Sequence, residues 1–327
     1  MIEKIKTGVI GVGSMGQNHA RIYNEISNLV GVADPDPEQG SKVAERFGVI
    51  WYSDYREMLE HVDAVSIAVP TAMHIQVAKL VAASGVHLLV EKPLASNAVD
   101  GESIVRAAER AGVILAVGHV ERHNPVIIHA KTCIDSGVWG DILTISVKRF
   151  SNYPARVRDV GVLFDLTIHD VDVIRYLLND NVKNVFVSGG KSKNKKFEDH
   201  VNLMMTFEEG SLGLCETNWL TPMKVREMNI TTTDCFISLN YLNQEVEVLS
   251  SEFGEINEAN LYQPPMKIKE HKVSLKGIEP LKSELVDFLE AIIEKRMPLV
   301  TGWDGLKAVE IVQAGLESMR SSSVINF

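Results

Sequence analysis

The sequence predicts an α/β protein with two domains: a parallel sheet wrapped by helices over residues 1–120, and an α+β domain with a large open sheet over residues 121–327. Its length of 327 residues is typical of about two domains. As far as residue 119, short apolar runs alternate with helix-length amphipathic segments, which is the pattern of a parallel sheet covered by helices. Beyond residue 120 strand-like stretches follow one another, and such a run indicates a second sheet domain.

The first domain is expected to alternate strand and helix from its start. Its predicted strands are the apolar runs 7–10, 30–33, 64–69, 86–90 and 114–117. The amphipathic segments between them predict helices over residues 15–26, 37–47, 74–83 and 98–111. Asn97 is suited to cap the last of these helices, and Gly112 is a usual residue at which a helix ends.

The second domain begins with a predicted helix over residues 125–135 and then becomes rich in strands. The predicted strands lie at 143–150, 185–188, 201–207, 212–217 and 235–239. A final amphipathic helix over residues 305–319 has apolar side chains near helical spacing, so it is expected to pack against the body of the protein.

The composition is that of an ordinary globular protein, with 45% hydrophobic and 23% charged residues. A net charge of −10 argues against nucleic acid as a partner, because such binding needs a basic face. Cys133, Cys215 and Cys235 lack any C-x-x-C spacing, so they indicate neither a disulfide framework nor a metal site. The N-terminus is charged where a secretory signal is apolar, and no apolar run reaches the ~18 residues of a membrane span. A cytoplasmic protein with no membrane contact is therefore expected.

A glycine-rich turn, Gly11-Val12-Gly13-Ser14-Met15-Gly16, follows the first predicted strand. The first glycine permits a tight turn, the second lets the backbone approach a pyrophosphate, and the third allows close packing of the next helix. The phosphates of a dinucleotide would meet the positive N-terminus of that helix, where Ser14 and Met15 lie. Strand, turn, helix and a later acidic residue occur in the order of a Rossmann domain, so a dinucleotide-binding site is predicted.

The acidic residue is Asp34, at the end of the second predicted strand. A carboxylate there accepts hydrogen bonds from both ribose hydroxyls of NAD, whereas it would repel the 2′-phosphate of NADP. Pro35 and Asp36 follow and offer no basic side chain for the 2′-phosphate of NADP, so the predicted cofactor is NAD.

Two further strand ends carry side chains at the rim where open α/β sheets bind ligands. At one of them the Lys92 ammonium can stabilise the alkoxide that forms as hydride leaves a substrate, and Glu91 can hold that ammonium in place. A solvated Glu-Lys pair is the alternative. At the other, Pro70, Thr71 and His74 are predicted to line the cofactor groove, and a plain turn capped by Thr71 is the alternative.

Asp165, His169 and Asp172 are predicted to share one face of a helix, because they are spaced at i, i+4 and i+7. A histidine beside a carboxylate is a good proton acceptor near neutral pH, so a catalytic pair is predicted. A structural histidine near a helix start is one alternative. A metal site is another, although this spacing offers few of the ligands that it would need.

Gly11-x-Gly13-x-x-Gly16, Glu91-Lys92-Pro93 and Asp165-x-x-x-His169-Asp170 together resemble the glucose-fructose oxidoreductase/inositol dehydrogenase (Gfo/Idh/MocA) family over nearly the whole chain. The resemblance implies a Rossmann domain followed by a domain with a large, mainly antiparallel open sheet. It implies NAD(P)-dependent oxidation of a sugar or cyclitol hydroxyl, and a homodimer or homotetramer formed through that sheet. In the family the lysine matching Lys92 contacts substrate and nicotinamide, the histidine matching His169 is a usual acid/base, and the Lys92-Pro93 peptide is expected to be cis.

A narrower likeness within the family concerns the substrate. The segments that contain Arg122 and Asn124, and Tyr153, Arg156 and Arg158, look like those of UDP-N-acetylglucosamine 3-dehydrogenases. They imply a nucleotide-sugar substrate that these residues bind together with Lys92 and His169.

Basic residues also gather just before the predicted catalytic helix of this acidic chain, namely Lys148, Arg149, Arg156 and Arg158. Arginine forks suit a diphosphate, and a solvated basic strand edge is the alternative. Three other functions stay open: a free-sugar or inositol dehydrogenase, a redox-neutral glycosidase that reduces and restores its NAD in each turnover, and a sensor that binds NAD and a ligand without catalysis.

Overall fold

The computed structural model describes residues 2–153, 160–193, 196–253, 266–275 and 277–327. The chain divides into two compact units, which are Met1–His123 with Glu279–Gln313, and Asn124–Ile278 with Ala314–Phe327. The first segment ends close to the boundary predicted near residue 120. The segment Glu279–Gln313 differs from the prediction, because it packs with the first unit and not with the second.

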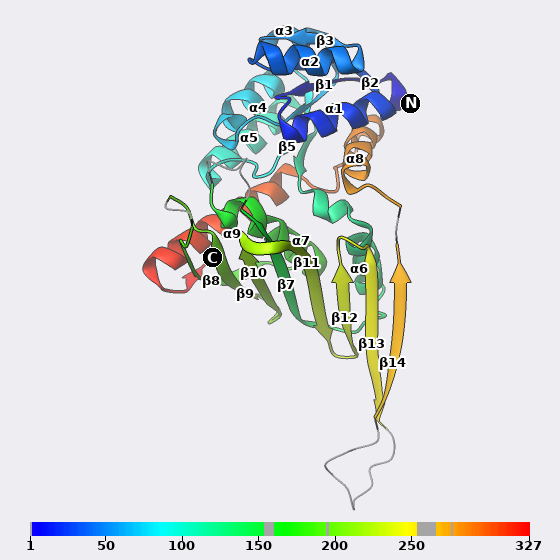
Figure 1. Cartoon of the computed structure of the whole chain (residues 1–327), viewed down its shortest axis with the longest axis vertical. Coiled ribbons are helices and arrows are strands. Elements are labelled where there is room, and N and C mark those ends of the chain that lie inside the picture. Colours follow the sequence, from blue (N-terminus) through cyan, green and yellow to red (C-terminus); the bar gives the residue numbers. More distant parts are fainter. Residues whose placement is uncertain (1, 154–159, 194–195, 254–265, 276) are drawn as a thin grey trace, which may run out of the picture. The chain divides into compact units, whose positions relative to one another are not determined.

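In the first unit the described residues form a parallel sheet of six strands in the order β3-β2-β1-β4-β5-β6 (Figure 1). The strands are β1 (Lys6–Ile10), β2 (Asn28–Ala33), β3 (Ile50–Tyr52), β4 (Ala64–Ile67), β5 (His87–Glu91) and β6 (Leu115–Gly118). The order reverses between β1 and β4, and doubly wound sheets bind their ligands at the carboxyl ends of the strands at such a switch point. The predicted Rossmann fold is confirmed.

The four predicted helices lie between these strands as α1 (Ser14–Ile26), α2 (Pro37–Phe47), α4 (His74–Ala83) and α5 (Ala98–Ala111). A short helix that was not predicted, α3 (Tyr55–Met58), follows β3. From the end of the chain, α8 (Pro280–Glu294) and the first part of α9 (Gly302–Ser321) also belong to this unit, and 3-10 turns lie at Ile2–Lys4, Leu59–His61, Thr71–Met73 and Val120–His123. The predicted ends of α5 are confirmed: the Asn97 side chain accepts a hydrogen bond from the Asp100 backbone N–H, and Gly112 has a φ of +67°.

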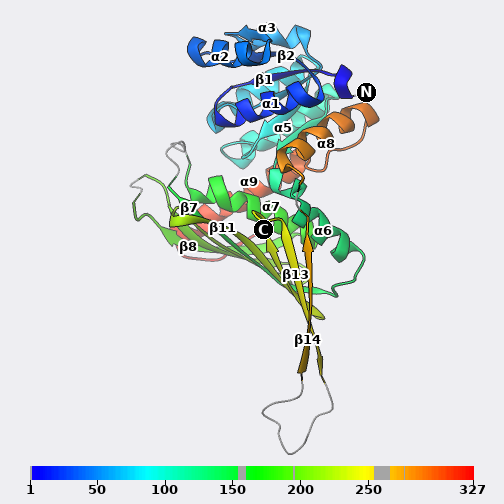
Figure 2. The ribbon, with the colours of Figure 1, turned by 45° about the vertical axis from the view of Figure 1, so that its right-hand side comes forward.

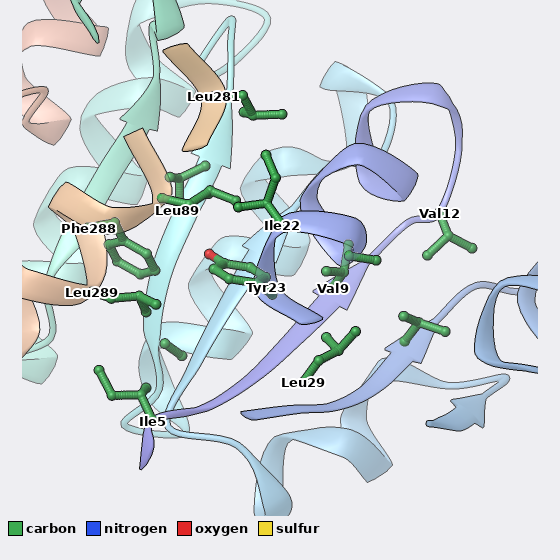
Figure 3. Packing of buried hydrophobic residues seen from close by; sticks show 14 of the residues in the cluster. Ile5, Val9, Val12, Ile22, Tyr23, Leu29, Leu89, Leu281, Phe288 and Leu289 are labelled. Carbon is green, nitrogen blue, oxygen red and sulfur yellow. The ribbon is translucent and has the colours of Figure 1, made fainter. Parts of the chain in front are cut away.

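One hydrophobic cluster joins α1 to the sheet and to α8 (Figure 3). Ile22 and Tyr23 of α1 are fully buried, and they pack with Leu89 of β5 and with Phe288 and Leu289 of α8. The sequence-based prediction contains no helix at α8. Its apolar face is what attaches this late segment of the chain to the first unit.

In the second unit the described residues form a sheet of nine strands in the order β14-β13-β12-β11-β7-β10-β9-β8-β15. The pair β10–β7 is parallel and the other pairs of neighbouring strands among the described residues are antiparallel, so the expectation of a mainly antiparallel sheet is confirmed. The strands are β7 (Ile142–Asn152), β8 (Val182–Gly190), β9 (His200–Phe207), β10 (Leu212–Asn218), β11 (Leu220–Thr232), β12 (Cys235–Asn240), β13 (Glu245–Phe253), β14 (Met266–Ser274) and β15 (Ile325–Asn326).

Helices cover one face of this sheet and leave the other face open (Figure 2). They are α6 (Pro125–Asp135), a π-helical turn (Leu163–Thr167) that leads directly into α7 (Ile168–Leu178), and the last part of α9. Side chains alternate accordingly along the strands: Leu203 and Met205 of β9 are buried, whereas Met204 between them is 39% exposed. Within the described part of the chain, no helix combines the length and the apolar character that crossing a membrane requires.

Candidate active site

The glycine-rich turn has the geometry of a phosphate-binding turn. Gly11 adopts a φ of +84°, and its backbone N–H donates to the Ala33 carbonyl at 2.8 Å. A Cβ atom at Gly16 would lie 1.8 Å from the Gly11 carbonyl oxygen, so α1 can start this close to the turn only with glycine there. Gly13 is the N-cap of α1, and a Cβ there would meet no atom within 4 Å. The N-terminus of α1 is thus free of capping side chains, which suits the pyrophosphate of a dinucleotide.

Asp34 lies at the end of β2, beside this turn, as predicted. Its carboxylate accepts hydrogen bonds from the Val12 backbone N–H at 2.8 Å and the Gln39 amide at 3.2 Å through Oδ2, and from the Asp36 backbone N–H at 2.9 Å through Oδ1. A carboxylate has about four acceptor positions and three of them are used here, so one remains for a ribose hydroxyl. Gly11, Gly13, Gly16 and Asp34 therefore fit NAD.

Glu91 and Lys92 lie at the carboxyl end of β5, and the Lys92-Pro93 peptide is cis, as expected. Glu91 is buried; its Oε1 accepts a hydrogen bond from His19 at 2.9 Å, and its Oε2 accepts one from the Lys92 backbone N–H at 3.1 Å. Burial alone would raise the pKa of Glu91. The bond from His19 and the positive charge of Lys92 outweigh that effect and hold the pKa below its usual range, so the carboxylate is ionised.

His74 lies at this rim but points into the protein. Its Nδ1 is 2.9 Å from the Pro93 carbonyl oxygen and its Nε2 is 3.0 Å from the Val69 carbonyl oxygen, so the ring joins two loops of the rim. Burial lowers the pKa of His74. Both ring nitrogens lie against backbone carbonyl oxygens, so the ring braces the two loops, and its contact with the cofactor stays a prediction. Pro70 is exposed and Thr71 half-buried at the same edge, and neither provides a side-chain cap for the turn Thr71–Met73.

In the second unit Asp165 and His169 are both buried, on the π-helical turn and the first turn of α7. The sequence predicts a regular helix here, and the structure differs because the backbone is wound as a π-helix over Leu163–Thr167. Single π turns occur frequently at functional sites. Among the described residues, no three His, Cys, Asp or Glu side chains gather in a group that could hold a metal ion.

Arg149 does not face a ligand, contrary to its place in the basic cluster of the sequence. It is buried, its Nε is 2.7 Å from an Asp170 carboxylate oxygen, and its guanidinium lies 5.4 Å from the centre of the Tyr241 ring. The pair holds β7 against α7. Lys148, next to it on β7, is exposed on the other face of the strand.

Two residues predicted to bind substrate have structural partners. Arg122 is buried and donates to the Asp304 carboxylate at 3.1 Å and to the Leu299 carbonyl at 3.2 Å. Asn124 is buried and caps α6 by accepting a hydrogen bond from the Val126 backbone N–H. These contacts anchor the start of α9 and of α6, and the substrate-binding role of both residues stays a prediction.

The remaining predicted substrate residues follow β7. Tyr153 is 40% exposed and packs edge-to-face on Trp219, with ring centres 5.4 Å apart. Arg156 and Arg158 lie outside the described residues, so their role stays a prediction.

His19 is a residue of this region that the sequence-based prediction lacks. It is fully buried on α1, with Nδ1 2.8 Å from Ser66 Oγ and Nε2 2.9 Å from Glu91 Oε1. The one signal in the sequence is its place three residues after Gly16, on the helix that starts at the glycine turn. That spacing does not reveal that its partner lies on β5.

Comparison with known proteins agrees with this geometry. Residues 5–119 match an oxidoreductase family with an NAD-binding Rossmann fold, and residues 127–238 match the GFO/IDH/MocA C-terminal domain. The chain is 29% identical over 314 residues to the UDP-N-acetylglucosamine 3-dehydrogenase of Acidithiobacillus ferrooxidans, with 96% of each chain covered. It is 28% identical over 340 residues to the scyllo-inositol 2-dehydrogenase (NAD(+)) of Bacillus subtilis, with 98% of this chain and 96% of that one covered. A solved structure of the Acidithiobacillus ferrooxidans enzyme GnnA has a TM-score of 0.88 at 27% identity, and covers 97% of this chain and 98% of its own.

Proposed function

We propose that this chain, which belongs to the Gfo/Idh/MocA family of NAD-dependent oxidoreductases, oxidises the 3-hydroxyl of UDP-N-acetylglucosamine or of a related nucleotide sugar. The observation that carries the choice of substrate is the likeness to a UDP-N-acetylglucosamine 3-dehydrogenase, in sequence and in fold, over nearly the whole of both chains. Its cofactor is NAD, which fits the glycine turn and Asp34 and supplies the hydride acceptor when bound.

In this proposal two side chains handle the hydroxyl group. His169 removes its proton, and Asp165 keeps the imidazole oriented for that task. The Lys92 ammonium stabilises the negative charge that develops on the oxygen as the C–H bond gives up its hydride. The Glu91 carboxylate supports this role, because it accepts a hydrogen bond from the Lys92 backbone N–H and so holds the lysine segment in place. Tyr153, Arg156 and Arg158 are proposed to contact the nucleotide part of the substrate.

A substrate panel tests the proposal. We expect UDP-N-acetylglucosamine to yield NADH with a far higher kcat/KM than scyllo-inositol, myo-inositol or glucose. A preference for an inositol would favour the second candidate, a cyclitol dehydrogenase, which the inositol-oxidising relative supports. Release of sugar from a glycoside without net NADH would point to the redox-neutral glycosidase, and binding without any turnover would point to a sensor.

Variants of the two proposed catalytic residues test the chemistry. Lys92→Ala and His169→Ala should each lower kcat roughly 100-fold to 10,000-fold, the usual range for removing an acid/base or oxyanion contact, while NADH affinity measured by fluorescence changes little. Lys307→Ala is a matched control, because that lysine is half-exposed and pairs with Glu310. Near-normal turnover in Lys92→Ala or His169→Ala would remove that residue from the mechanism.

We also propose that the chain is a cytoplasmic homodimer or homotetramer joined through the open face of the second sheet. Leu214 of β10 lies directly opposite Met204 of β9 on that face, and both are more than a third exposed. Paired apolar side chains on an uncovered sheet face favour association. Leu214→Glu should lower the molar mass found by light scattering, and an unchanged mass would exclude this part of the sheet from the interface. Cys133, Cys215 and Cys235 are free thiols, which suits a reducing compartment.

A further inference from the structure

A buried chain of polar side chains crosses the first unit from α1 to the end of β5. Tyr23 Oη lies 2.8 Å from Ser66 Oγ, which lies 2.8 Å from His19 Nδ1. His19 Nε2 lies 2.9 Å from Glu91 Oε1, and the other Glu91 oxygen accepts the Lys92 backbone N–H. Tyr23, Ser66 and His19 are fully buried, so each link is shielded from water.

The two hydrogen bonds to Glu91 have a fixed direction. Glu91 is ionised and can only accept, so His19 must donate to it through Nε2. Nδ1 of a neutral imidazole accepts from the Ser66 hydroxyl, whereas Nδ1 of a protonated imidazole donates to it. Burial raises the pKa of the Tyr23 hydroxyl, which therefore keeps its proton beside Ser66. In both forms of His19 the Glu91 carboxylate is held by His19 on one side and by the Lys92 backbone on the other.

We propose that His19 is a positioning residue: it holds the Glu91 carboxylate, and through it the Lys92 backbone, in the place that the catalytic lysine needs. The inference rests on the proposed function only for the role of Lys92. His19 lies on α1, the helix that starts at the dinucleotide turn, so a single imidazole ties the cofactor-binding element to the strand end that carries the lysine. Room for the carboxylate comes from Gly118 on β6, where a Cβ atom would lie 3.1 Å from Glu91.

The first test is kinetic, with UDP-N-acetylglucosamine or the panel member that the wild-type enzyme oxidises. His19→Leu removes both hydrogen bonds at similar volume and should lower kcat roughly 10-fold to 100-fold. NADH affinity should change less than about threefold, because the glycine turn and Asp34 are untouched. His19→Gln keeps an amide donor that can reach Glu91, so it should recover most of the lost kcat. His61→Leu is the matched control, since that histidine of the same unit is exposed.

The second test separates positioning from a general loss of structure. In a Lys92→Ala background, His19→Leu should cost less than about threefold in kcat, because His19 acts only through the lysine. An undiminished loss in that background would overturn the inference, as would normal kcat in His19→Leu. If His19→Leu does not fold, His19→Asn, which is too short to reach Glu91, serves in its place with the same expected outcomes.

A third readout does not depend on turnover. Amide hydrogen exchange at Lys92 should be faster in His19→Leu than in the wild type, and His19→Gln should restore slow exchange. Unchanged exchange in His19→Leu would overturn the inference even where Lys92 is catalytic. Conversely, full turnover in Lys92→Ala together with faster exchange in His19→Leu would refute the proposed function and leave the contact between His19 and the Lys92 segment standing.

Discussion

Alanine substitutions at Gly13 and Gly16 should separate two requirements of the dinucleotide turn, namely stability and ligand approach. At Gly16 the new methyl group would lie 1.8 Å from the Gly11 carbonyl oxygen, whereas real contacts of a Cβ atom essentially never fall below 3.0 Å. Backbone would have to separate from backbone by more than ~1 Å, and no side-chain rotation can relieve the clash. At Gly13 the same methyl group meets no atom within 4 Å, and the φ of −64° is open to any residue.

The magnitudes follow from these contacts. Overpacking at Gly16 should cost ~3 kcal/mol, and the better helix propensity of alanine offsets ~1 kcal/mol of it, which leaves ~2 kcal/mol. For a unit of this size that loss lowers the melting temperature by about 4–8 °C. In Gly13→Ala alanine is the poorer N-cap, which lowers stability, but it also makes the unfolded chain less flexible, which raises stability. The two effects nearly cancel, so the melting temperature should stay within ~2 °C of the wild-type value.

NAD affinity should fall in both variants. A methyl group at residue 13 occupies the space through which the pyrophosphate approaches the helix N-terminus, so one hydrogen bond to the pyrophosphate should be lost. A hydrogen bond to a charged group is worth about 1.5–3 kcal/mol, so the Kd for NAD should rise roughly 10-fold to 100-fold. Calorimetry of the NAD-free protein and a fluorescence titration with NADH measure the two effects. An equal loss of melting temperature in the two variants, or an unchanged Kd in Gly13→Ala, would refute this account of the turn.

Two further predictions concern stability. Burial lowers the pKa of His74 in the folded chain, so its contribution to stability is present above the unfolded pKa of about 6.5 and is lost as the pH falls below that value. The melting temperature of His74→Gln should therefore depend less on pH between pH 7.5 and 5.5 than that of the wild type, and an identical dependence in both proteins would contradict this. Arg149→Met leaves the buried Asp170 carboxylate without its guanidinium and should lower the free energy of unfolding by about 3–5 kcal/mol in denaturant titrations. The double variant Arg149→Met/Asp170→Leu should recover most of this loss. Equal losses in the single and the double variant would show that the unpaired charge is not the cause.

The sequence predicts the first unit well because its signals are local. The glycine turn, the apolar strands and the capped helix α5 each depend on neighbours within a few residues, so pattern and structure agree. Helix α8 and its attachment to the first unit depend on packing of Phe288 and Leu289 against α1, more than 250 residues earlier in the chain, and no local pattern announces such a contact. The strands β13 and β14 also escape prediction. In β14 eight of the nine residues are exposed, so its apolar side chains do not mark a buried face.

The candidate site shows the same division between residue type and residue environment. Lys92 and Asp34 follow strand ends and Gly11 and Gly13 lie between β1 and α1, as the sequence predicts, because these positions depend on local pattern alone. The burial of Arg149 and Arg122 is not evident from the sequence, because basic residues are usually exposed and the sequence does not reveal their partners Asp170 and Asp304. The π-helical turn before His169 likewise has no local signature.

Cofactor and substrate are specified in different ways in this chain. The NAD site depends on backbone geometry, since Gly11 needs a positive φ and Gly16 leaves no space for a side chain, and few substitutions preserve either condition. Substrate identity depends on side chains that can be exchanged without disturbing the fold. Relatives with the same two domains can therefore keep hydride transfer to NAD while they exchange a nucleotide sugar for a cyclitol. It follows that Gly13→Ala should lower activity at limiting NAD by the same factor for every substrate, whereas substitutions at Tyr153 should change the ranking of substrates in the panel and leave NADH affinity intact.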